Sequence, residues 1–437
     1  MKTIRIVLSL LLALTMLHGC GGSGSSSSSS PTTGSVRLVN ATNAFASLDM
    51  IASGGTLASA VALASAVATG SASTYAAIAP GIYTFSLALS GSGIPSAQQP
   101  LLIASAVNYA LVAHTVAGQL QLTALTEIEL APAAGDGKIR VSHLAAQDTG
   151  SVDVYMSANG GTLANASALV NNVSGTSAYF EIPQGTYHIW VTGVGNKADL
   201  RLDLPSVVIS NQQVLTLALT ATRGGVLVDG WLITQQAAVS AQINASARVR
   251  VAANITAGGT IAATANGVSL DSATLVSPAV DTYALVPAGA LSMSVVVNGN
   301  TVNVPNLNAA AGADLTLLAV GTGASPQFFL LSDDNRLPFS GNAKLRLVNG
   351  VNGLAGNISL TADANLVAQN VAFGTASAAA AIATTGNISQ LQVNSAGNVA
   401  LLTPSYGVTL QPAGVYSVFM LNNTTTAVPI AIVRADR

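Results

Sequence analysis

A pattern that recurs four times along the chain constrains its fold more than any other feature. Each copy opens with a short apolar segment around an arginine, and the copies follow one another at intervals of about a hundred residues. The segments are SVRLVN at 35, KIRVSH at 138, RVRVAA at 248 and KLRLVN at 344, with arginines Arg37, Arg140, Arg250 and Arg346. Self-similarity at a fixed spacing predicts tandem copies of one folding unit.

A second landmark follows in each copy and ends in a glycine. The four segments are STYAAIAPG, SAYFEIPQG, DTYALVPAG and AAAAIATTG, which end in Gly81, Gly185, Gly289 and Gly386. Pro followed by Gly between two apolar runs predicts a turn with the glycine at positive φ. Six residues before the glycine lie Tyr75, Tyr179, Tyr283 and, in the fourth copy, Ala380. We expect each tyrosine ring to pack in a core, with its hydroxyl on a backbone group.

Short alternating runs such as IYTFSLAL and TYHIWVTG predict antiparallel strands, since they are bounded by Gly, Pro, Asn and Ser. About seven strands per hundred residues favours an all-β chain of four tandem Ig-like antiparallel β-sandwich domains. The predicted repeats 1 to 4 cover 35–130, 138–236, 247–334 and 343–437. A unit of this size can bury its own core, so we expect independent beads joined by short linkers into a semi-rigid rod.

The second copy resembles a known family. GKIRVSHLAAQDTGSVDVYMSANGG followed by SAYFEIPQGTYHIWV is similar to the bacterial domain of unknown function 4397, with its V-D-V-Y strand at Val152–Tyr155 and its tyrosine–proline–glycine hairpin. The resemblance is clearest over 138–236 and weaker in the other copies; the first copy keeps Asp49 of that strand. It implies extracytoplasmic Ig-like sandwiches, often in tandem on lipoproteins, and no established activity.

Residues 1–19 have the pattern of a signal peptide. Lys2 and Arg5 precede an apolar stretch that ends in Leu17-His18-Gly19-Cys20, which resembles the lipobox of bacterial lipoproteins. That resemblance implies cleavage before Cys20 and lipidation of this cysteine, the only one in the chain. The glycine- and serine-rich run within 20–34 predicts a flexible tether. Gly21 in place of an aspartate favours the outer membrane if the source is Gram-negative.

Composition excludes some function classes. Only 7% of the residues are charged, the formal net charge is −2 and no basic run exists, which argues against a nucleic-acid partner. With one cysteine, a disulfide within the chain and a multi-cysteine metal site are excluded.

A search for chemistry finds no convincing cluster, and we predict no catalytic, cofactor-binding or metal-binding residues. The histidines His114, His143 and His188 lack zinc spacing, and His143, with Asp148 and Asp153 nearby, suits a polar residue that caps a strand end. The pairs Glu127 and Glu129, and Asp333 and Asp334, suit solvent-facing charges at sheet edges. Each repeated arginine is expected to pair inside its own domain; the alternative is an exposed row that binds a ligand.

The leading hypothesis is a non-enzymatic cell-envelope lipoprotein, held to the membrane through Cys20, whose domains act as scaffold, spacer or adhesion module. The alternative is an envelope lipoprotein that binds a glycan or peptide through loops or strand edges of repeat 2, where Trp190 and Trp231 lie. An envelope protein and a glycan are the open partner classes. An enzyme assembled from distant loops is the third class.

Overall fold

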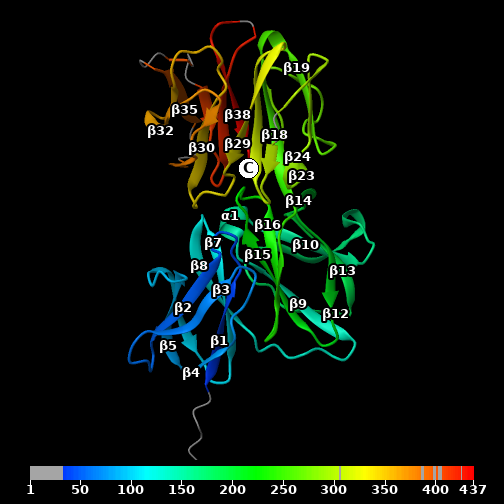
Figure 1. Cartoon of the computed structure of the whole chain (residues 1–437), viewed down its shortest axis with the longest axis vertical. Helices are drawn as coiled ribbons and strands as arrows, with labels where there is room; N and C mark the ends of the chain where they lie inside the picture. The colour runs from blue at the N-terminus through cyan, green and yellow to red at the C-terminus, as the bar shows by residue number, and fades with distance from the viewer. Residues whose placement is uncertain (1–32, 305–306, 385–387, 397–399, 402–405, 425) are drawn as a thin grey trace, which may run out of the picture.

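The computed structural model describes residues 33–304, 307–384, 388–396, 400–401, 406–424 and 426–437. The predicted lipidation site Cys20, the residues before it and Gly386 lie outside these ranges. The described chain forms two lobes joined at a waist, with repeats 1 and 2 in one lobe and repeats 3 and 4 in the other (Figure 1). Each repeat is a β-sandwich, so the predicted all-β class is confirmed.

The first lobe holds strands β1 to β17. Repeat 1 contains β1 (Gly34–Asn40), β2 (Ser47–Gly54), β3 (Val61–Ala68), β4 (Ala76–Ile78), β5 (Gly81–Leu89), β6 (Pro95–Ile103), β7 (Asn108–Val116) and β8 (Gln119–Thr126). Repeat 2 contains β9 (Asp136–His143), α1 (Ala146–Thr149), β10 (Val152–Ala158), η1 (Leu163–Asn165), β11 (Ser167–Val173), β12 (Phe180–Pro183), β13 (Gly185–Gly193), β14 (Asn196–Ile209), β15 (Val214–Ala221), β16 (Val228–Thr234) and β17 (Val239–Gln242).

The second lobe holds strands β18 to β38. Repeat 3 contains β18 (Ser246–Ile255), η2 (Thr256–Gly258), β19 (Thr260–Ala265), β20 (Val268–Ser269), β21 (Leu275–Val276), β22 (Ala279–Val280), β23 (Ala284–Pro287), β24 (Gly289–Leu291), β25 (Met293–Val297), β26 (Asn300–Val302), β27 (Leu307–Ala309), β28 (Asp314–Thr322) and β29 (Ser325–Asp333). Repeat 4 contains β30 (Asn342–Asn349), β31 (Ile358–Ala362), β32 (Asn365–Val371), β33 (Thr375–Ala376), β34 (Ala380–Ala383), β35 (Ile388–Ser395), β36 (Tyr406–Thr409), β37 (Val415–Leu421) and β38 (Ile430–Ala435).

Each sandwich has an inner sheet, which contains the arginine strand, and an outer sheet. In repeat 1 the inner sheet has the order β4-β1-β7-β8 and the outer sheet β3-β2-β5-β6. The inner sheets of the other repeats are built around β9 and β15, β18 and β28, and β30 and β37. The arginine strand pairs in parallel with its neighbour in every repeat. The remaining ladders between described strands are antiparallel, as predicted.

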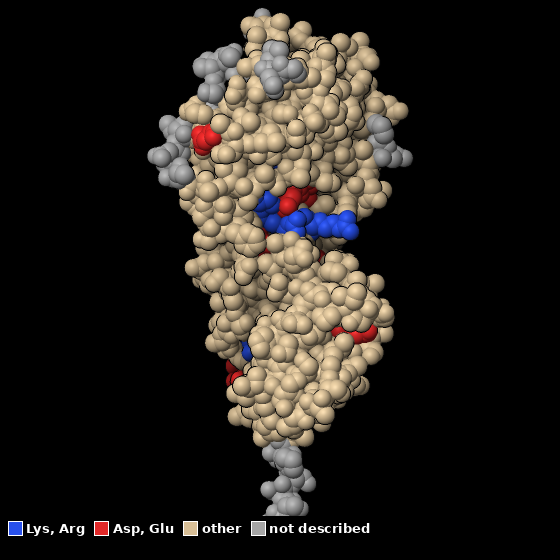
Figure 2. Space-filling view, turned by 90° about the vertical axis from the view of Figure 1, so that its left-hand side faces the viewer, with Lys and Arg blue, Asp and Glu red and all other residues tan. Residues whose placement is uncertain are grey.

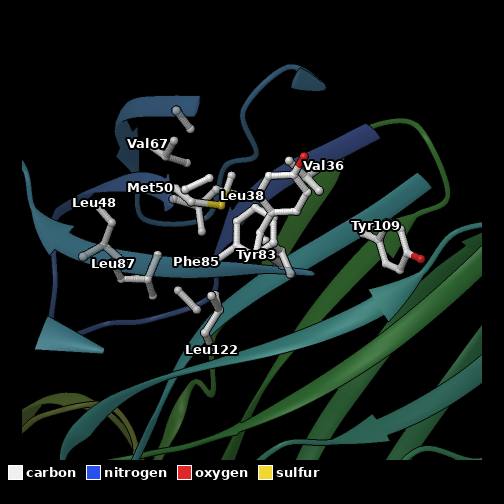
Figure 3. Packing of buried hydrophobic residues seen from close by; sticks show 14 of the residues in the cluster. Val36, Leu38, Leu48, Met50, Val67, Tyr83, Phe85, Leu87, Tyr109 and Leu122 are labelled. Atoms are coloured by element: carbon white, nitrogen blue, oxygen red, sulfur yellow. The ribbon is translucent and has the colours of Figure 1, made fainter. Parts of the chain in front are cut away.

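The core of each sandwich lies between its own two sheets. In repeat 1, Leu38 of β1 and Leu111 of β7 face Met50 of β2 and Phe85 of β5, and all four side chains are fully buried. Figure 3 shows Leu38, Met50 and Phe85 converging between the two layers. Alternate residues of these strands point into this core because side chains alternate across a strand. The equivalent cores of the other repeats are separate clusters.

A second type of core joins the repeats in pairs. Each repeat buries its own core as predicted, but the repeats are not beads joined by linkers alone. The inner sheets of repeats 1 and 2 pack against each other through Val39, Ala41, Ala110, Val112, Leu125, Ala218, Trp231 and Ile233. The inner sheets of repeats 3 and 4 do the same through Ala252, Val280, Leu318, Val320, Val348, Phe419 and Leu421. Each inner sheet is therefore buried on both faces, and the paired sandwich is the unit of packing.

The segment before each repeated glycine is a corner between the two sheets, not a hairpin. In repeat 2, β12 pairs with β9 of the inner sheet, whereas β13 pairs with β10 and β14 of the outer sheet. The predicted positive φ occurs at Gly289, where φ is 105°, but not at Gly185. The Tyr187 hydroxyl donates to the Pro183 carbonyl at 2.7 Å, which ties the strand after the corner to the strand before it.

Candidate functional site

The four repeated arginines lie on the face of each inner sheet that packs against the partner repeat. Their exposed fractions are between 1% and 9%. In three repeats the arginine Nε donates to a hydroxyl on the residue opposite it in the parallel neighbour strand: Arg140 to Thr216, Arg250 to Thr316 and Arg346 to Ser417, at 2.7–2.9 Å. In repeat 1 that opposite residue is Ala110, and Arg37 Nε donates instead to Glu127 at 3.0 Å.

In the first lobe the two arginines reach across the interface in reciprocal fashion. Arg37 of repeat 1 donates to the Thr234 carbonyl at 3.0 Å, and Arg140 of repeat 2 donates to the Thr126 carbonyl at 3.2 Å. Thr234 ends β16 and Thr126 ends β8, so the two contacts join equivalent places in the paired repeats. Each arginine thus satisfies a backbone carbonyl of its neighbour, which stabilises the packing of the two sheets.

In the second lobe the same contacts are strengthened by buried carboxylates. Arg250 of repeat 3 forms an ion pair with Asp436 of repeat 4. Arg346 of repeat 4 forms an ion pair with Asp333 of repeat 3, at 2.7 Å, and donates to the Ser332 carbonyl at 3.1 Å. Hydrogen bonds of charged groups are stronger than neutral ones, and they are strongest where water is excluded. The predicted pairing inside a repeat is found for Arg37 with Glu127 and for Arg250 with Asp333. The arginines also bridge repeats, which was not predicted.

Two of the acidic residues that we predicted to face solvent belong to this network, and that prediction was wrong. Glu127 is 3% exposed and Asp333 is 4% exposed. Each follows or ends the last strand of its inner sheet, next to the arginine. Their neighbours Glu129 and Asp334 are partly exposed, as predicted for edge charges, and pair with Lys138 and Lys344.

The repeated tyrosines lie against the repeated arginines. The guanidinium carbon lies 5.1 Å from the ring centre of Tyr75 in repeat 1, 4.6 Å from that of Tyr179 in repeat 2 and 4.5 Å from that of Tyr283 in repeat 3. The Tyr283 hydroxyl donates to Asp333 at 2.5 Å, and Tyr75 donates to Glu127. Desolvation raises the pKa of Tyr283 well above its usual value, with the Asp333 charge adding to the shift. The predicted backbone partner is therefore corrected: these two hydroxyls bind carboxylates.

Repeat 4 lacks this tyrosine. The strand pairing shows that the residue at the tyrosine position is one residue before Ala380, the counterpart predicted from the sequence. Ala380 pairs with Leu345, just as Phe180 pairs with Ile139 in repeat 2. The residue beside Arg346 that matches Tyr179 is therefore Ala379, not Ala380. A small side chain at this place leaves space next to the arginine.

Ala379 itself lines a pocket of about 480 Å³ at the waist. We call it the junction pocket; its lining includes Val116, Asp334, Arg336, Phe339, Lys344 and Ala379. Asp334 binds Arg336 at 2.8 Å and Lys344 at 2.9 Å, and these two cations hold the pKa of Asp334 at about 2 against desolvation by burial. The Phe339 side chain is 71% exposed at the rim. Figure 2 shows basic and acidic side chains gathered at the waist of a face with few other charges.

The predicted strand-end role of His143 is confirmed. His143 is the last residue of β9, and its Nε2 lies 2.9 Å from the Gly150 carbonyl and 3.1 Å from the Thr149 hydroxyl. Burial lowers its pKa to about 4, so the ring is neutral at pH 7. At the equivalent strand ends, Asn40 and Asn349 donate to backbone carbonyls at 3.0 Å.

The nearby aspartates are also used within the fold, and they do not converge on His143. Asp153 accepts from the Asn172 and Gly195 amides, at 2.8 Å each, and fixes a bulged strand and a hairpin turn. Asp49 accepts from the Ala66 and Gly91 amides in the same manner. Both oxygens of Asp148 accept from the Ala117 amide, so this residue of α1 joins the two repeats of the first lobe.

The two tryptophans do not form a loop cluster. Trp231 of β16 is fully buried between repeats 1 and 2 and donates to the Thr220 hydroxyl at 2.8 Å. Trp190 of β13 is 4% exposed and stacks on His188 with ring centres 3.7 Å apart. His188 also pairs with Asp203. The third histidine, His114, lies 2.9 Å from the Thr123 hydroxyl, and burial lowers its pKa to about 4.

Within the described ranges, no group of three or more His, Cys, Asp or Glu residues is placed to hold a metal ion. No helix in the described part of the chain is long and apolar enough to cross a membrane.

The fold and its arginine bridges define a tandem β-sandwich protein whose domains associate in pairs. The chain belongs to the family described as domain of unknown function (DUF4397), whose model matches residues 34–155 and 247–353. This confirms the resemblance; the matched ranges cover repeat 1 with the start of repeat 2, and repeat 3 with the start of repeat 4. The rest of repeat 2 lies outside them although its sheets have the same arrangement.

No curated protein matches the sequence. Among solved structures, the chain is similar to the Bacillus anthracis TIE protein, with 10% identity, over 67% of this chain and 51% of that one, at a TM-score of 0.15. The chain thus spans about half the length of that structure, and a TM-score this low places no constraint on the fold.

Proposed function

We propose that the chain is a non-enzymatic cell-envelope lipoprotein, lipidated at Cys20, whose paired sandwiches serve as scaffold, spacer or adhesion module. The observation that carries this proposal is that the repeated polar residues make contacts between repeats. The arginines and the acids around them are the groups most suited to chemistry, and the arginines are buried in contacts between repeats. Such contacts make a stiff assembly and engage these groups in holding the repeats together.

The anchor part of the proposal rests on the sequence around Cys20. Two or more acyl chains hold a protein stably at a membrane, whereas one chain holds it only marginally. A lipid at Cys20, followed by the run of glycine and serine, would let the first lobe project away from the bilayer. With Gly21 after the cysteine, we place the protein at the outer membrane in a Gram-negative source.

Replacing Cys20 with serine is expected to abolish incorporation of a fatty-acid analogue and to leave precursor or a form that washes off the membrane fraction. The thiol is the attachment point, so no partial effect is expected. Ser25→Ala in the same run is the control and should be labelled as strongly as the native chain. Label on the Cys20→Ser variant equal to that of the control contradicts the lipoprotein proposal.

The second candidate function is the binding of a glycan or peptide, and the junction pocket favours it over the loops of repeat 2. The pocket combines the exposed aromatic ring of Phe339 with the charged side chains of Asp334 and Lys344. Ligand pockets typically combine aromatic side chains with a few polar groups. Trp190 and Trp231, which had pointed to repeat 2, are buried on strands.

Ala379→Tyr tests this second function, because it places in repeat 4 the ring that the other repeats carry beside their arginine. We expect the variant to lose at least about tenfold in affinity for any glycan or peptide that the native chain selects on an array, since the ring fills the pocket. Ala58→Tyr, on an exposed turn of repeat 1, is the control. Unchanged binding by Ala379→Tyr removes the junction pocket from this role, and an array without hits removes the second function.

A further inference from the structure

A second pocket at the waist gathers arginines from three repeats. Its volume is about 530 Å³, and we call it the arginine pocket. The arginines that line it are Arg201 of β14, Arg248 and Arg250 of β18, Arg434 of β38 and Arg437. Three aspartates, Asp199, Asp281 and Asp436, also line it, so arginines outnumber acidic side chains in the lining by two.

Three of these arginines have a carboxylate partner. Arg201 pairs with Asp199 at 2.8 Å, Arg248 with the fully buried carboxylate of Asp314 at 3.2 Å, and Arg250 with Asp436. The third aspartate of the lining, Asp281, is held by the amides of Ser272 and Thr282, at 2.7 Å each. These amides lower the pKa of Asp281 although burial opposes them, so its charge is stabilised without an arginine.

The other two arginines have no carboxylate side chain as a partner. Arg437 is partly buried, and its side chain donates to backbone carbonyls, those of Asp148, Thr149, Gly225 and Asn335. Burial, followed by repulsion from Arg201 and Arg248, lowers the pKa of Arg437 to about 9, so it remains positively charged at pH 7. Arg434 is half-buried and lines the pocket, and its side chain has no hydrogen bond or ion pair to any described residue.

We propose that the arginine pocket binds an oxyanion, the phosphate or carboxylate group of an anionic ligand, with Arg434 as its principal contact. A guanidinium presents a planar fork of N–H donors that matches two oxygens of such a group. Arg434 is free to make this contact because no group of the described chain uses its donors. Arg437 and Arg248 add positive potential from the pocket wall. Arg434 takes no part in the contacts between repeats, although Arg250 and Asp436, which form one of them, also line the pocket.

Isothermal titration of the full chain in detergent, in low-salt buffer without phosphate, tests the proposal with two probes: inorganic phosphate and citrate. We expect at least one probe to bind at one site per chain. The variant Arg434→Gln keeps a hydrogen-bonding side chain but removes the charge, and should weaken that binding at least about tenfold. The control is Arg223→Gln, because the Arg223 side chain is also unpaired in the described chain but is exposed and lies outside the arginine pocket.

If the native chain binds phosphate and Arg434→Gln does not, the ligand group of the pocket is a phosphate. If the same holds for citrate, the ligand group is a carboxylate. Absence of binding by both probes overturns the proposal. Equal affinity of Arg434→Gln and the native chain overturns it as well, and so does an equal loss in Arg223→Gln, which would reflect overall charge. Thermal unfolding of each variant without ligand should match the native chain, so a failure to fold is recognised separately.

Discussion

Replacing Arg250 with methionine is expected to destabilise the second lobe by about 3–5 kcal/mol, because it breaks a buried ion-pair network from one side. Arg250 is 1% exposed and lies between the carboxylates of Asp333 and Asp436, which are themselves excluded from water. Asp333 would keep Arg346, but Asp436 would lose its cation. Buried charge without a partner costs far more than the pair contributes when it is intact.

Thermal unfolding checks this result. At about 2–4 °C per kcal/mol for a unit of this size, the second lobe should unfold at least about 6 °C earlier than in the native chain. Arg223→Met, which changes an exposed arginine in the same way, should shift the midpoint by less than about 1–2 °C. The double variant Arg250→Met with Asp436→Leu should recover part of the loss, since it removes the stranded carboxylate. An Arg250→Met midpoint equal to that of the native chain would mean that the network contributes nothing to association of the repeats.

Replacing Trp231 with alanine is expected to destabilise the first lobe by about 3–5 kcal/mol. The indole is fully buried between the inner sheets of repeats 1 and 2, next to Val112 and Ala218 of the same cluster. Its removal leaves a cavity that two rigid sheets cannot close, and it leaves the Thr220 hydroxyl without its donor.

Chemical denaturation followed by circular dichroism measures this loss. Phe339→Ala is the matched control, because it also truncates a large aromatic residue but one that is 71% exposed, and its midpoint should stay close to that of the native chain. A loss for Trp231→Ala as small as for Phe339→Ala would contradict the burial of Trp231 in an interface that supports folding.

The alternating pattern was sufficient to predict the outer sheets. In β2 and β19 buried residues alternate with partly exposed ones, so the period of two was visible. It was misleading for the inner sheets, where β7, β15, β28 and β37 are buried on both faces. Their segments, such as VLTLALTA, are mostly apolar and are interrupted only by small polar residues, which indicates strands covered on both sides. That signal could have predicted the pairing of repeats.

The polar network was harder to predict from one sequence. The arginines recur at a fixed place in the repeats, but the acids around them are Glu127, Asp333 and Asp436, and in repeat 2 the residue at the corresponding strand end is Gln235. A carboxylate next to a strand end suits both an exposed edge and a buried ion pair, and only the tertiary packing distinguishes them. The junction pocket and the arginine pocket also depend on residues from several repeats, whose proximity no local pattern reveals.

The pairing of repeats is the central claim, and scanning calorimetry of the chain from residue 33 to 437 tests it most directly. Because each pair shares a buried core and reciprocal arginine contacts, we predict that repeats 1 and 2 unfold together and that repeats 3 and 4 unfold together. Trp231→Ala should then lower the transition of the first lobe, and Arg250→Met that of the second. Four separate transitions, with Trp231→Ala shifting that of repeat 2 alone, would show instead that the repeats are independent beads.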